Sequence, residues 1–400
     1  MDYSNYKYMD SLFLEEYKAM DNLDVFSEDE LRVIKVNNAT VLPCKNIDGK
    51  KHAGVLDNKG KYVELSAFEA LSPVDCWGGS YEIPDTIAYI DEKVMYMGRF
   101  WRHWGHFIMD LVSRLWYVVE VDKSIKIVYD ANADISGVYL EFMRLLGIEE
   151  NRLIRVDEPT RFRSVIVPEC SHKPGISCNV RYKNIFDTVC ENALMESNLG
   201  NKYADAKIYF TRTGLNLRFP LEAGEKDIEK LFMNNDYLIV SPEKYSLVEQ
   251  VVMLRQAKEI ACVAGTLPHN MMFANDGASL IVIRKTNKPN YRQTDVNQIR
   301  KLKVTNIDAH ISPFAVGAAG PFILDVNNNV KNFFEDRNMK FKYSRFLRFW
   351  KIKGRMLWYI PLYFARNKGK KPNVPLFDGK QFSTRDTAKK ELFRYYFKRI

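Results

Sequence analysis

Hydrophobic and polar positions alternate along the N-terminal half of the chain in a way that predicts short strands and helices. The first hundred residues combine brief apolar stretches with turn residues such as Gly78-Gly79. Beyond them, we expect a helix at 101–119, a strand at 125–129, a helix at 137–146 and short strands at 153–156 and 164–167. Strands that alternate with helices favour an α/β layer of parallel strands.

A more regular alternation follows in the second half, after a linker at 168–179 and a helix at 181–197. We expect strands at 207–210, 237–240, 260–263 and 279–283, with helices between them at 226–233, 246–257 and 267–274. This order is typical of a Rossmann-like, doubly wound half. The two halves together predict an α/β fold with two Rossmann-like lobes facing a cleft. Ligands are then expected outside the carboxyl ends of the strands.

Charge is distributed unevenly along the 400 residues. The chain has a formal charge of +9, from 59 Lys+Arg and 50 Asp+Glu. Residues 331–400 hold 20 Lys+Arg, 5 Asp+Glu and 17 aromatic residues, so this segment carries +15 and residues 1–330 carry −6. A basic, aromatic C-terminal segment on a slightly acidic body indicates a polyanionic surface as a partner.

Composition and motifs exclude several classes of protein. The 46% hydrophobic and 27% charged residues are typical of a soluble globular protein, and the apolar runs fall short of the ~20 residues of a membrane span. The N-terminus lacks a secretory arrangement, which makes the cytoplasm the expected location. The cysteines show no metal-ligand spacing, and neither the G-x-G-x-x-G nor the G-x-x-x-x-G-K-[ST] signature occurs.

The expected helix at 101–119 carries the first candidate site. On a helix, with about 100° per residue, its polar residues share one stripe: His103, His106, Asp110, Ser113, Arg114 and Tyr117. His106 and Asp110 are four residues apart and can hydrogen-bond, which suits a general base held on a rigid element. The stripe also suits an exposed helix face with an Asp110–Arg114 pair, and His103, His106 and Asp110 could face one metal ion.

A second candidate site follows the strands of the second half. Arg212 lies just beyond the strand at 207–210, and Arg218 lies in the same loop. An arginine in this position can bind a diphosphate with a bidentate fork, or lie solvated at the surface. Gly265 and Thr266 join a strand directly to the helix that carries His269 and Asn270, where a ligand could approach the backbone. Glu249 could accept hydrogen bonds from ribose hydroxyls or be an ordinary surface residue.

Taken in order, these segments resemble glycosyltransferase family 61. The matching pieces are 105–110 (GHFIMD) with Arg114, 209–212 (YFTR) with Arg218, and 246–250 (SLVEQ) followed by Ala257 and 263–273 (VAGTLPHNMMF). Where much of the family has His-Gly, this chain has Ala264-Gly265, and a histidine follows only at His269. A histidine–phosphate contact at the family's usual place is therefore not carried over.

The resemblance implies a GT-B fold and an inverting glycosyltransferase that needs no metal or other cofactor. The predicted domains are an N-terminal acceptor-binding lobe at 1–180, a C-terminal nucleotide-sugar-binding lobe at 181–310, and a basic, aromatic helical extension at 311–400. The expected donor is a sugar linked to a nucleoside diphosphate, most simply UDP. The expected acceptor is a glycan or lipid-linked glycan used in bacterial capsule or surface polysaccharide synthesis.

Roles for individual residues follow from this reaction. Asp110 is the first choice for the base that deprotonates the acceptor, with His106 as its orienter or as the base itself. His103 and Arg114 are expected on the acceptor side. Residues expected to hold the donor and its phosphates are Arg212, Arg218, Glu249, Gly265, Thr266, His269 and Asn270.

The C-terminal segment is expected to bring the enzyme to the inner face of the cell membrane. It interleaves Lys and Arg with aromatic residues, as in interfacial amphipathic helices, and each cation near an anionic leaflet adds about 1 kcal/mol. It could instead pack its aromatic residues on the N-terminal lobe. Rival functions are another GT-B-like transferase, such as a polysaccharide pyruvyltransferase, and a non-catalytic nucleic-acid-binding protein. The second rival leaves the central motifs unexplained, so no nucleic acid is expected as a partner.

Overall fold

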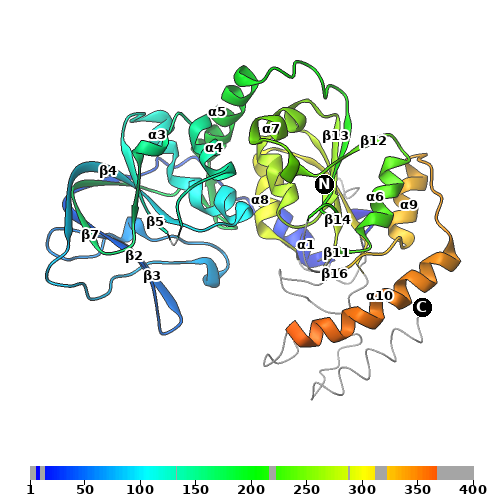
Figure 1. Cartoon of the computed structure of the whole chain (residues 1–400), viewed down its shortest axis with the longest axis horizontal. Helices are drawn as coiled ribbons and strands as arrows, with labels where there is room; N and C mark the ends of the chain where they lie inside the picture. The colour runs from blue at the N-terminus through cyan, green and yellow to red at the C-terminus, as the bar shows by residue number, and fades with distance from the viewer. Residues whose placement is uncertain are drawn as a thin grey trace.

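The computed structural model describes residues 6–9, 14–131, 133–215, 222–286, 289–310 and 322–366. The N-terminal half is built on a mixed sheet (Figure 1). Its strands, in spatial order, are β3 (Lys50–Leu56), β2 (Val33–Ile47), β7 (Thr160–Pro168), β4 (Ala88–Phe100), β5 (Lys126–Ala131) and β6 (Leu153–Val156). The strands from β7 to β6 are parallel, whereas β2 pairs antiparallel with both β3 and β7.

This half therefore differs from the Rossmann-like lobe expected from the sequence. Asp48 and Gly49, with φ of 50° and 78°, reverse the chain between Ile47 and Lys50. An Asp-Gly pair with two positive φ angles forms the tight turn that joins antiparallel strands. Such a turn cannot join parallel neighbours, which need a crossover of about a dozen residues. The antiparallel β2–β3 hairpin is the consequence.

The C-terminal half contains a fully parallel sheet, as expected. Its spatial order is β12 (Tyr237–Val240), β10 (Lys207–Phe210), β13 (Glu259–Val263), β14 (Ser279–Arg284) and β15 (Lys303–Asp308). Numbered along the chain this order is 2-1-3-4-5, the doubly wound arrangement in which ligands bind where the strand order reverses, here between β10 and β13. The sequence predicted the first four of these strands and missed β15.

Helices cover these sheets. In the N-terminal half they include α3 (Trp116–Glu120), α4 (Val138–Leu145) and α5 (Val180–Glu196), and in the C-terminal half α6 (Glu225–Met233), α7 (Leu247–Gln256), α8 (Tyr291–Ile299) and α9 (Asn328–Asp336). Helix α5 packs against α4 on one side and α7 on the other, so it joins the two halves (Figure 1). Part of the expected linker at 168–179 forms β8 (His172–Lys173) and β9 (Ser177–Asn179), which extend β1 (Phe26–Ser27) into a small sheet.

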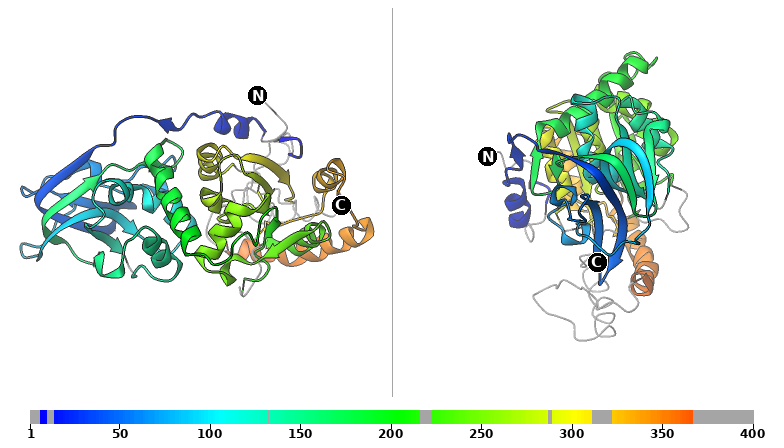
Figure 2. Two further views of the ribbon diagram at one scale, coloured as in Figure 1. Left: turned by 90° about the horizontal axis from the view of Figure 1, so that it is seen from above. Right: turned by 90° about the vertical axis from the view of Figure 1, so that its left-hand side faces the viewer.

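The N-terminal segment crosses to the C-terminal half. It runs along the outside of the molecule in Figure 2 and ends beside the parallel sheet. Tyr8 forms a parallel bridge to Ile307 in β15, and its hydroxyl donates to Asp336 of α9 at 2.9 Å. Helix α1 (Leu14–Asp21) places Tyr17 over the guanidinium of Arg284, 3.8 Å from the ring centre.

The last described helix, α10 (Arg345–Arg366), lies along the edge of the C-terminal half (Figure 1). Arg348 forms an ion pair with Asp325, and Lys351 and Arg355 both bind Asp227 of α6. Asp325 follows β16 (Phe322–Ile323), which pairs with β11 (Glu222–Ala223). No helix in the described ranges is both long enough and apolar enough to cross a bilayer.

Candidate functional site

The segment expected to form one helix at 101–119 is broken into short turns. It runs through α2 (Trp104–His106), a π-helical turn at Phe107–Leu111, a 3₁₀ turn at Val112–Arg114 and then α3. The predicted single polar face is therefore wrong. His106 remains partly exposed, whereas Asp110, Ser113 and Arg114 are each only 1% exposed. π-helical turns of this kind are frequent at functional sites.

His106 and Asp110 form the predicted pair. The Nδ1 atom of His106 lies 2.5 Å from Oδ2 of Asp110, and the side chain of His103 accepts a hydrogen bond from the backbone N–H of His106 at 3.4 Å. The Asp110 side chain is fully buried, and Arg292 of α8 binds it with Nε to Oδ1 at 2.9 Å and Nη2 to Oδ2 at 3.0 Å. Both carboxylate oxygens are thus engaged by partners inside the protein.

Electrostatics favour an ionised Asp110 beside neutral His103 and His269. Burial opposes the charge on Asp110, but the hydrogen bonds from His106 and Arg292 outweigh it and lower the pKa of this carboxyl. Burial also lowers the pKa of His103, and the nearby His106 adds to that effect. Burial lowers the pKa of His269 to about 3, with a further contribution from Arg292. His269 therefore carries no charge at neutral pH.

Arg114, which the sequence placed on the acceptor side, is buried and is not among the residues that line the cavity with His103 and His106. Its guanidinium is buried and donates to three backbone carbonyls, those of Pro168, Leu65 and Ala67, at 2.7–3.0 Å. It fixes the end of β7 against the loop at 65–67. Breaking the expected helix turned this side chain inward, away from His106.

The carboxyl ends of the parallel strands bring positive charge together. Arg212 follows β10, Gly265 follows β13, and Lys285 follows β14. Gly265 has a φ of +140°, and a Cβ atom placed on it would lie 3.2 Å from Nζ of Lys285 and 3.5 Å from Nη1 of Arg212. The two cations therefore converge on this glycine, where a side chain would fill the space between them.

Carboxylates sit behind these cations. Glu222 binds Lys285 at 2.7 Å and lies 3.6 Å from Nε of Arg212. Glu225 accepts a hydrogen bond from the backbone N–H of Arg212 at 3.0 Å. Burial lowers the pKa of Lys285, although the Glu222 carboxylate opposes that shift.

Three further predicted donor-site residues have separate positions. Thr266 and His269 flank the contact between the halves, because a Cβ atom on Gly105 would lie only 3.1 Å from Oγ1 of Thr266 and 3.3 Å from Nδ1 of His269. Nε2 of His269 lies 3.3 Å from Nδ2 of Asn290, and its Nδ1 is buried with no hydrogen-bond partner among the described residues. Asn270 instead accepts from Nε1 of Trp104 at 2.7 Å, which ties the halves together.

Glu249 has a structural role at the start of α7. Its carboxylate accepts from the backbone N–H of Ser246 at 3.1 Å, while the hydroxyl of Ser246 accepts from the N–H of Glu249 at 3.2 Å. This reciprocal capping box satisfies the free amides of the helix end. Within the described part of the chain, Glu249 and Asn270 lie outside the cavity lining. Arg218 lies outside the described residues.

The remaining candidates, apart from the buried Asp110, meet in one cavity of about 500 Å³. Its lining includes six of the residues expected from the sequence, namely His103, His106, Arg212, Gly265, Thr266 and His269. Residues that the sequence did not indicate also line it, among them Tyr17, Glu222, Lys285, Tyr291 and Arg292. Lys285 follows a predicted strand at the same sheet edge as Arg212, so its strand-end position was a usable signal. No pattern singled out Arg292.

A known protein family matches the central part of the chain. Residues 104–281 match the family model described as Glycosyltransferase 61. This match identifies the chain as a glycosyltransferase. Its central segment, from α2 to within β14, belongs to glycosyltransferase family 61. Among proteins of curated function, none matches this sequence.

Proposed function

We propose that this glycosyltransferase moves a sugar from a nucleoside diphosphate, most simply UDP, to a hydroxyl of a glycan or lipid-linked glycan, with inversion at the anomeric carbon. The observation that carries the proposal is the common cavity of His106 and the Arg212–Lys285 cations. A base and fixed positive charge in one cavity match the needs of sugar transfer from a diphosphate.

The base is assigned to His106. Asp110 was the first choice from the sequence, but its buried oxygens are held by His106 and Arg292. With Asp110 ionised, Nδ1 of His106 carries the proton and Nε2 is left to accept one. As the acceptor oxygen forms its bond to the anomeric carbon, its proton passes to Nε2. The bond from that carbon to the diphosphate oxygen breaks, and the diphosphate leaves with the electron pair.

The leaving diphosphate is assigned to the strand-end cations. Arg212 and Lys285 converge beside Gly265, where the absent side chain lets a phosphate approach the backbone. Charge-assisted hydrogen bonds in a buried site stabilise the negative charge that develops as the bond breaks. In this proposal the side chains offset that charge, so no metal ion is required. Arg218 is kept as a third candidate from the resemblance.

The proposed architecture is the two-lobe GT-B arrangement. The nucleotide-sugar would occupy the end of the parallel sheet, and the acceptor would approach His106 and His103 from the N-terminal half. The switch point between β10 and β13 supports this division, since doubly wound sheets bind nucleotides there.

A ligand panel tests this function. Purified protein is heated with UDP, other nucleoside diphosphates and phosphoenolpyruvate, and the melting temperature is recorded. Selective stabilisation by UDP is expected, and its loss in Arg212→Gln would tie binding to the strand ends. Incubation with UDP-sugars should then give slow donor hydrolysis in the absence of acceptor. Stabilisation by phosphoenolpyruvate alone would favour a pyruvyltransferase and contradict the proposal.

We further propose that α10 holds the enzyme at the inner face of the cell membrane, where a lipid-linked acceptor for surface polysaccharide is displayed. Phe346, Trp350 and Leu357 fall within about 40° of one another around a helix. They are 70%, 59% and 59% exposed. Exposed apolar side chains on a basic helix suit the interface of an anionic bilayer.

Co-sedimentation with vesicles tests the membrane proposal. Binding is expected to phosphatidylglycerol vesicles at low salt and to weaken with phosphatidylcholine alone. Trp350→Glu should reduce binding, whereas Met195→Glu, at a 76% exposed apolar position on α5, should leave it unchanged. Equal binding by both variants, or none by the wild type, would contradict the proposal.

A further inference from the structure

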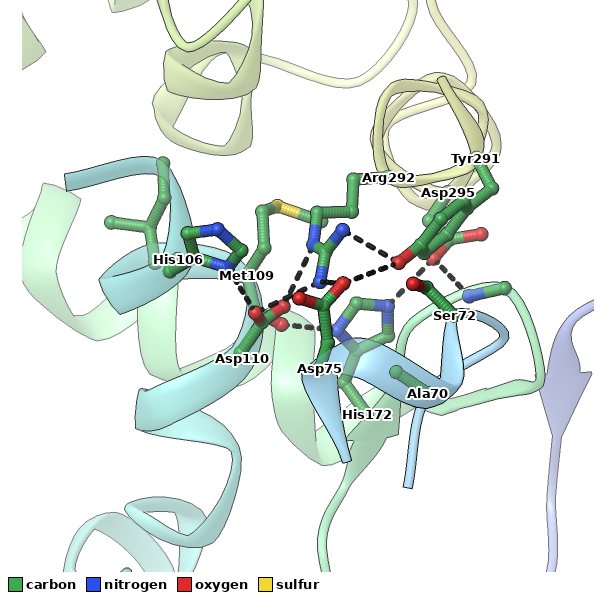
Figure 3. A network of polar contacts seen from close by, with 12 residues as sticks. Ala70, Ser72, Asp75, His106, Met109, Asp110, His172, Tyr291, Arg292 and Asp295 are labelled. Atoms are coloured by element: carbon green, nitrogen blue, oxygen red, sulfur yellow. Dashed lines mark hydrogen bonds and ion pairs between the residues drawn. The ribbon is translucent and has the colours of Figure 1, made fainter. Parts of the chain in front are cut away.

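Helix α8 reaches from the C-terminal half into the polar interior of the N-terminal half. Figure 3 shows Tyr291, Arg292 and Asp295 of this helix facing Asp75, Asp110 and His172. The ion pairs Arg292–Asp110, Arg292–Asp75 and Asp295–His172 have distances of 2.9, 2.9 and 3.0 Å. The side chains of Asp110, His172 and Asp295 are at most 2% exposed, so these contacts are shielded from water.

Arg292 contacts both oxygens of Asp110. Its fork supplies two hydrogen bonds, and only the Oδ2 atom is shared with His106. A planar bidentate pair fixes the orientation of a carboxylate as well as its charge. Burial opposes the charge on Arg292 itself, but Asp110 holds the pKa of the guanidinium above its ordinary value. The carboxylate that fixes His106 is thus fixed by an arginine from the opposite half.

A second anchor seats the helix beside the same backbone. Oδ2 of Asp295 lies 3.0 Å from Nε2 of His172 and accepts from the backbone N–H of Gly175 at 2.8 Å. Nδ1 of His172 lies 2.8 Å from the carbonyl oxygen of Met109, the residue before Asp110. Helix α8 therefore contacts the π-helical turn at two adjacent residues. Arg292 binds Asp110 directly, and Asp295 reaches Met109 through His172.

We infer that Arg292 is a positioning residue for the base. It keeps Asp110 ionised and oriented, so that His106 presents Nε2 only while α8 is seated against the N-terminal half. This inference rests on the proposed role of His106. The cavity lining also includes Tyr291, Arg292, Gln293 and Thr294 of α8. The position of this helix therefore links the wall of the proposed donor site to the protonation and orientation of His106.

The charge environment of His106 comes from several elements. Removing Arg292 takes away the cation nearest to Asp110 and leaves His106 as its remaining charged or hydrogen-bonding side-chain partner among those described here. The other ionisable groups that face the His106–Asp110 pair are His103, His269 after β13, Tyr291 and Arg292 of α8, Asp75 before β4 and Tyr182 of α5. Loss of the guanidinium should favour the imidazolium of His106, which cannot accept a proton. The variant should therefore need a higher pH than the wild type to reach its maximal rate.

Histidine-selective ¹⁵N NMR of the full-length protein tests the inference directly. The chain has 6 histidines, so the His106 signals can be assigned with His106→Gln. In the wild type at neutral pH, His106 is expected with Nδ1 protonated and Nε2 bare. In Arg292→Gln its signals should move toward a tautomer mixture or the imidazolium. Arg292→Lys, which keeps the charge but loses the fork, should give an intermediate shift.

Kinetics supply the second measurement. Loss of a residue that orients a catalytic group can misplace that group, and a misplacement of about 1 Å can cost about 100-fold in rate. Arg292→Gln should lower kcat by that factor with a smaller change in donor KM, and the acidic limb of its pH profile should move to higher pH. Arg292→Lys should recover part of the rate. If Arg292→Gln does not fold, Arg292→Lys carries the test, with a smaller shift in the same direction.

Arg300 provides the matched control. It is also buried, follows α8, and pairs with Asp187 at 2.8 Å without contacting Asp110. Arg300→Gln and Arg300→Lys should lower stability and leave the His106 signals in place. If the Arg292 variants lose rate while the His106 signals and the pH profile stay unchanged, the inference is overturned. The NMR measurement uses no donor, so an expected shift in a protein that transfers no sugar would count against the proposed function alone.

Discussion

Two groups of side chains at the cavity, named here the cationic end and the imidazole end, differ in how the fold positions them. At the cationic end, Arg212, Gly265 and Lys285 each follow a strand of one parallel sheet. At the imidazole end, His106 and Asp110 lie on an irregular segment whose geometry depends on Arg292, Asp75 and His172 from elsewhere in the chain. Regular secondary structure suffices at the first end, whereas the second requires tertiary contacts.

This difference has a functional consequence. In the proposed function, the cationic end depends on one packed sheet and would bind a diphosphate without help from the N-terminal half. The imidazole end would be competent only with the two halves in contact, because Arg292 comes from the C-terminal half. Changes at the cationic end should therefore weaken binding, and changes at the imidazole end should slow the chemical step.

Replacing His106 should give the largest effect. His106→Gln removes the proposed base, so kcat should fall by about 10²- to 10⁴-fold. UDP affinity, measured by calorimetry, should stay unchanged because Arg212 and Lys285 are intact. A large loss of UDP affinity with an unaltered kcat would show that His106 binds the donor, and would contradict the division between binding and catalytic side chains.

Glu225, which lies beside the cationic end, should make the folding stability of the protein depend on pH. Burial raises the pKa of this carboxyl from 4.5 to about 7. The folded state then holds a proton that the unfolded state releases, so stability should fall by about 3 kcal/mol as pH rises between these two values and stay level above them. Glu225→Gln should abolish most of that fall in denaturant titrations. An unchanged pH dependence in the variant would show that another group is responsible.

Arg212→Gln should produce the reverse of the His106 pattern. A hydrogen bond to a charged group contributes about 1.5–3 kcal/mol, which corresponds to roughly 10- to 150-fold weaker UDP binding. The loss should shrink at high salt. Arg255→Gln is the matched control. Arg255 lies on α7, pairs with Asp187 of α5 at 2.9 Å, and is not among the described cavity-lining residues. Equal losses in both variants would indicate a general charge effect.

Glu249→Ala should have the smallest effect. The capping box at the start of α7 is worth about 1 kcal/mol, so the midpoint of unfolding should fall slightly while UDP affinity stays the same. This outcome would separate Glu249 from the ribose-binding role expected from the sequence. A selective loss of UDP affinity at unchanged stability would restore that role.

The same comparison explains what the sequence could predict. Arg212 and Gly265 were found because they follow strands whose apolar pattern is clear, and the β10–β13 order places them together. His106 and Asp110 were found as a pair because four-residue spacing brings side chains together in either an α- or a π-helical turn. The C-terminal parallel sheet was predicted for the same reason as the strand ends, since buried parallel strands read as continuous apolar runs.

Other features depend on contacts that no local pattern encodes. A uniform helix at 101–119 would leave Arg114 on the polar face, but carbonyls from residues 65, 67 and 168 draw it inside. Arg292 lies 182 residues from Asp110. Glu249 matched a motif whose local function, capping a helix, is as consistent with its sequence as ligand binding. Motif residues therefore need tertiary geometry before roles can be assigned.

The crossing of the N-terminal segment also bears on how the chain is made. Tyr8 pairs with Ile307, so Tyr8 leaves the ribosome well before its partner strand, which follows nearly three hundred residues later. At the usual synthesis rates of about 5–20 residues per second, that delay is roughly 15–60 s. During this time Tyr8 and Tyr17 lack the β15 and Arg284 surfaces that cover them in the finished protein. The wall of the cavity that contains Tyr17 therefore assembles only after Arg284, far downstream of Tyr17, has been synthesised.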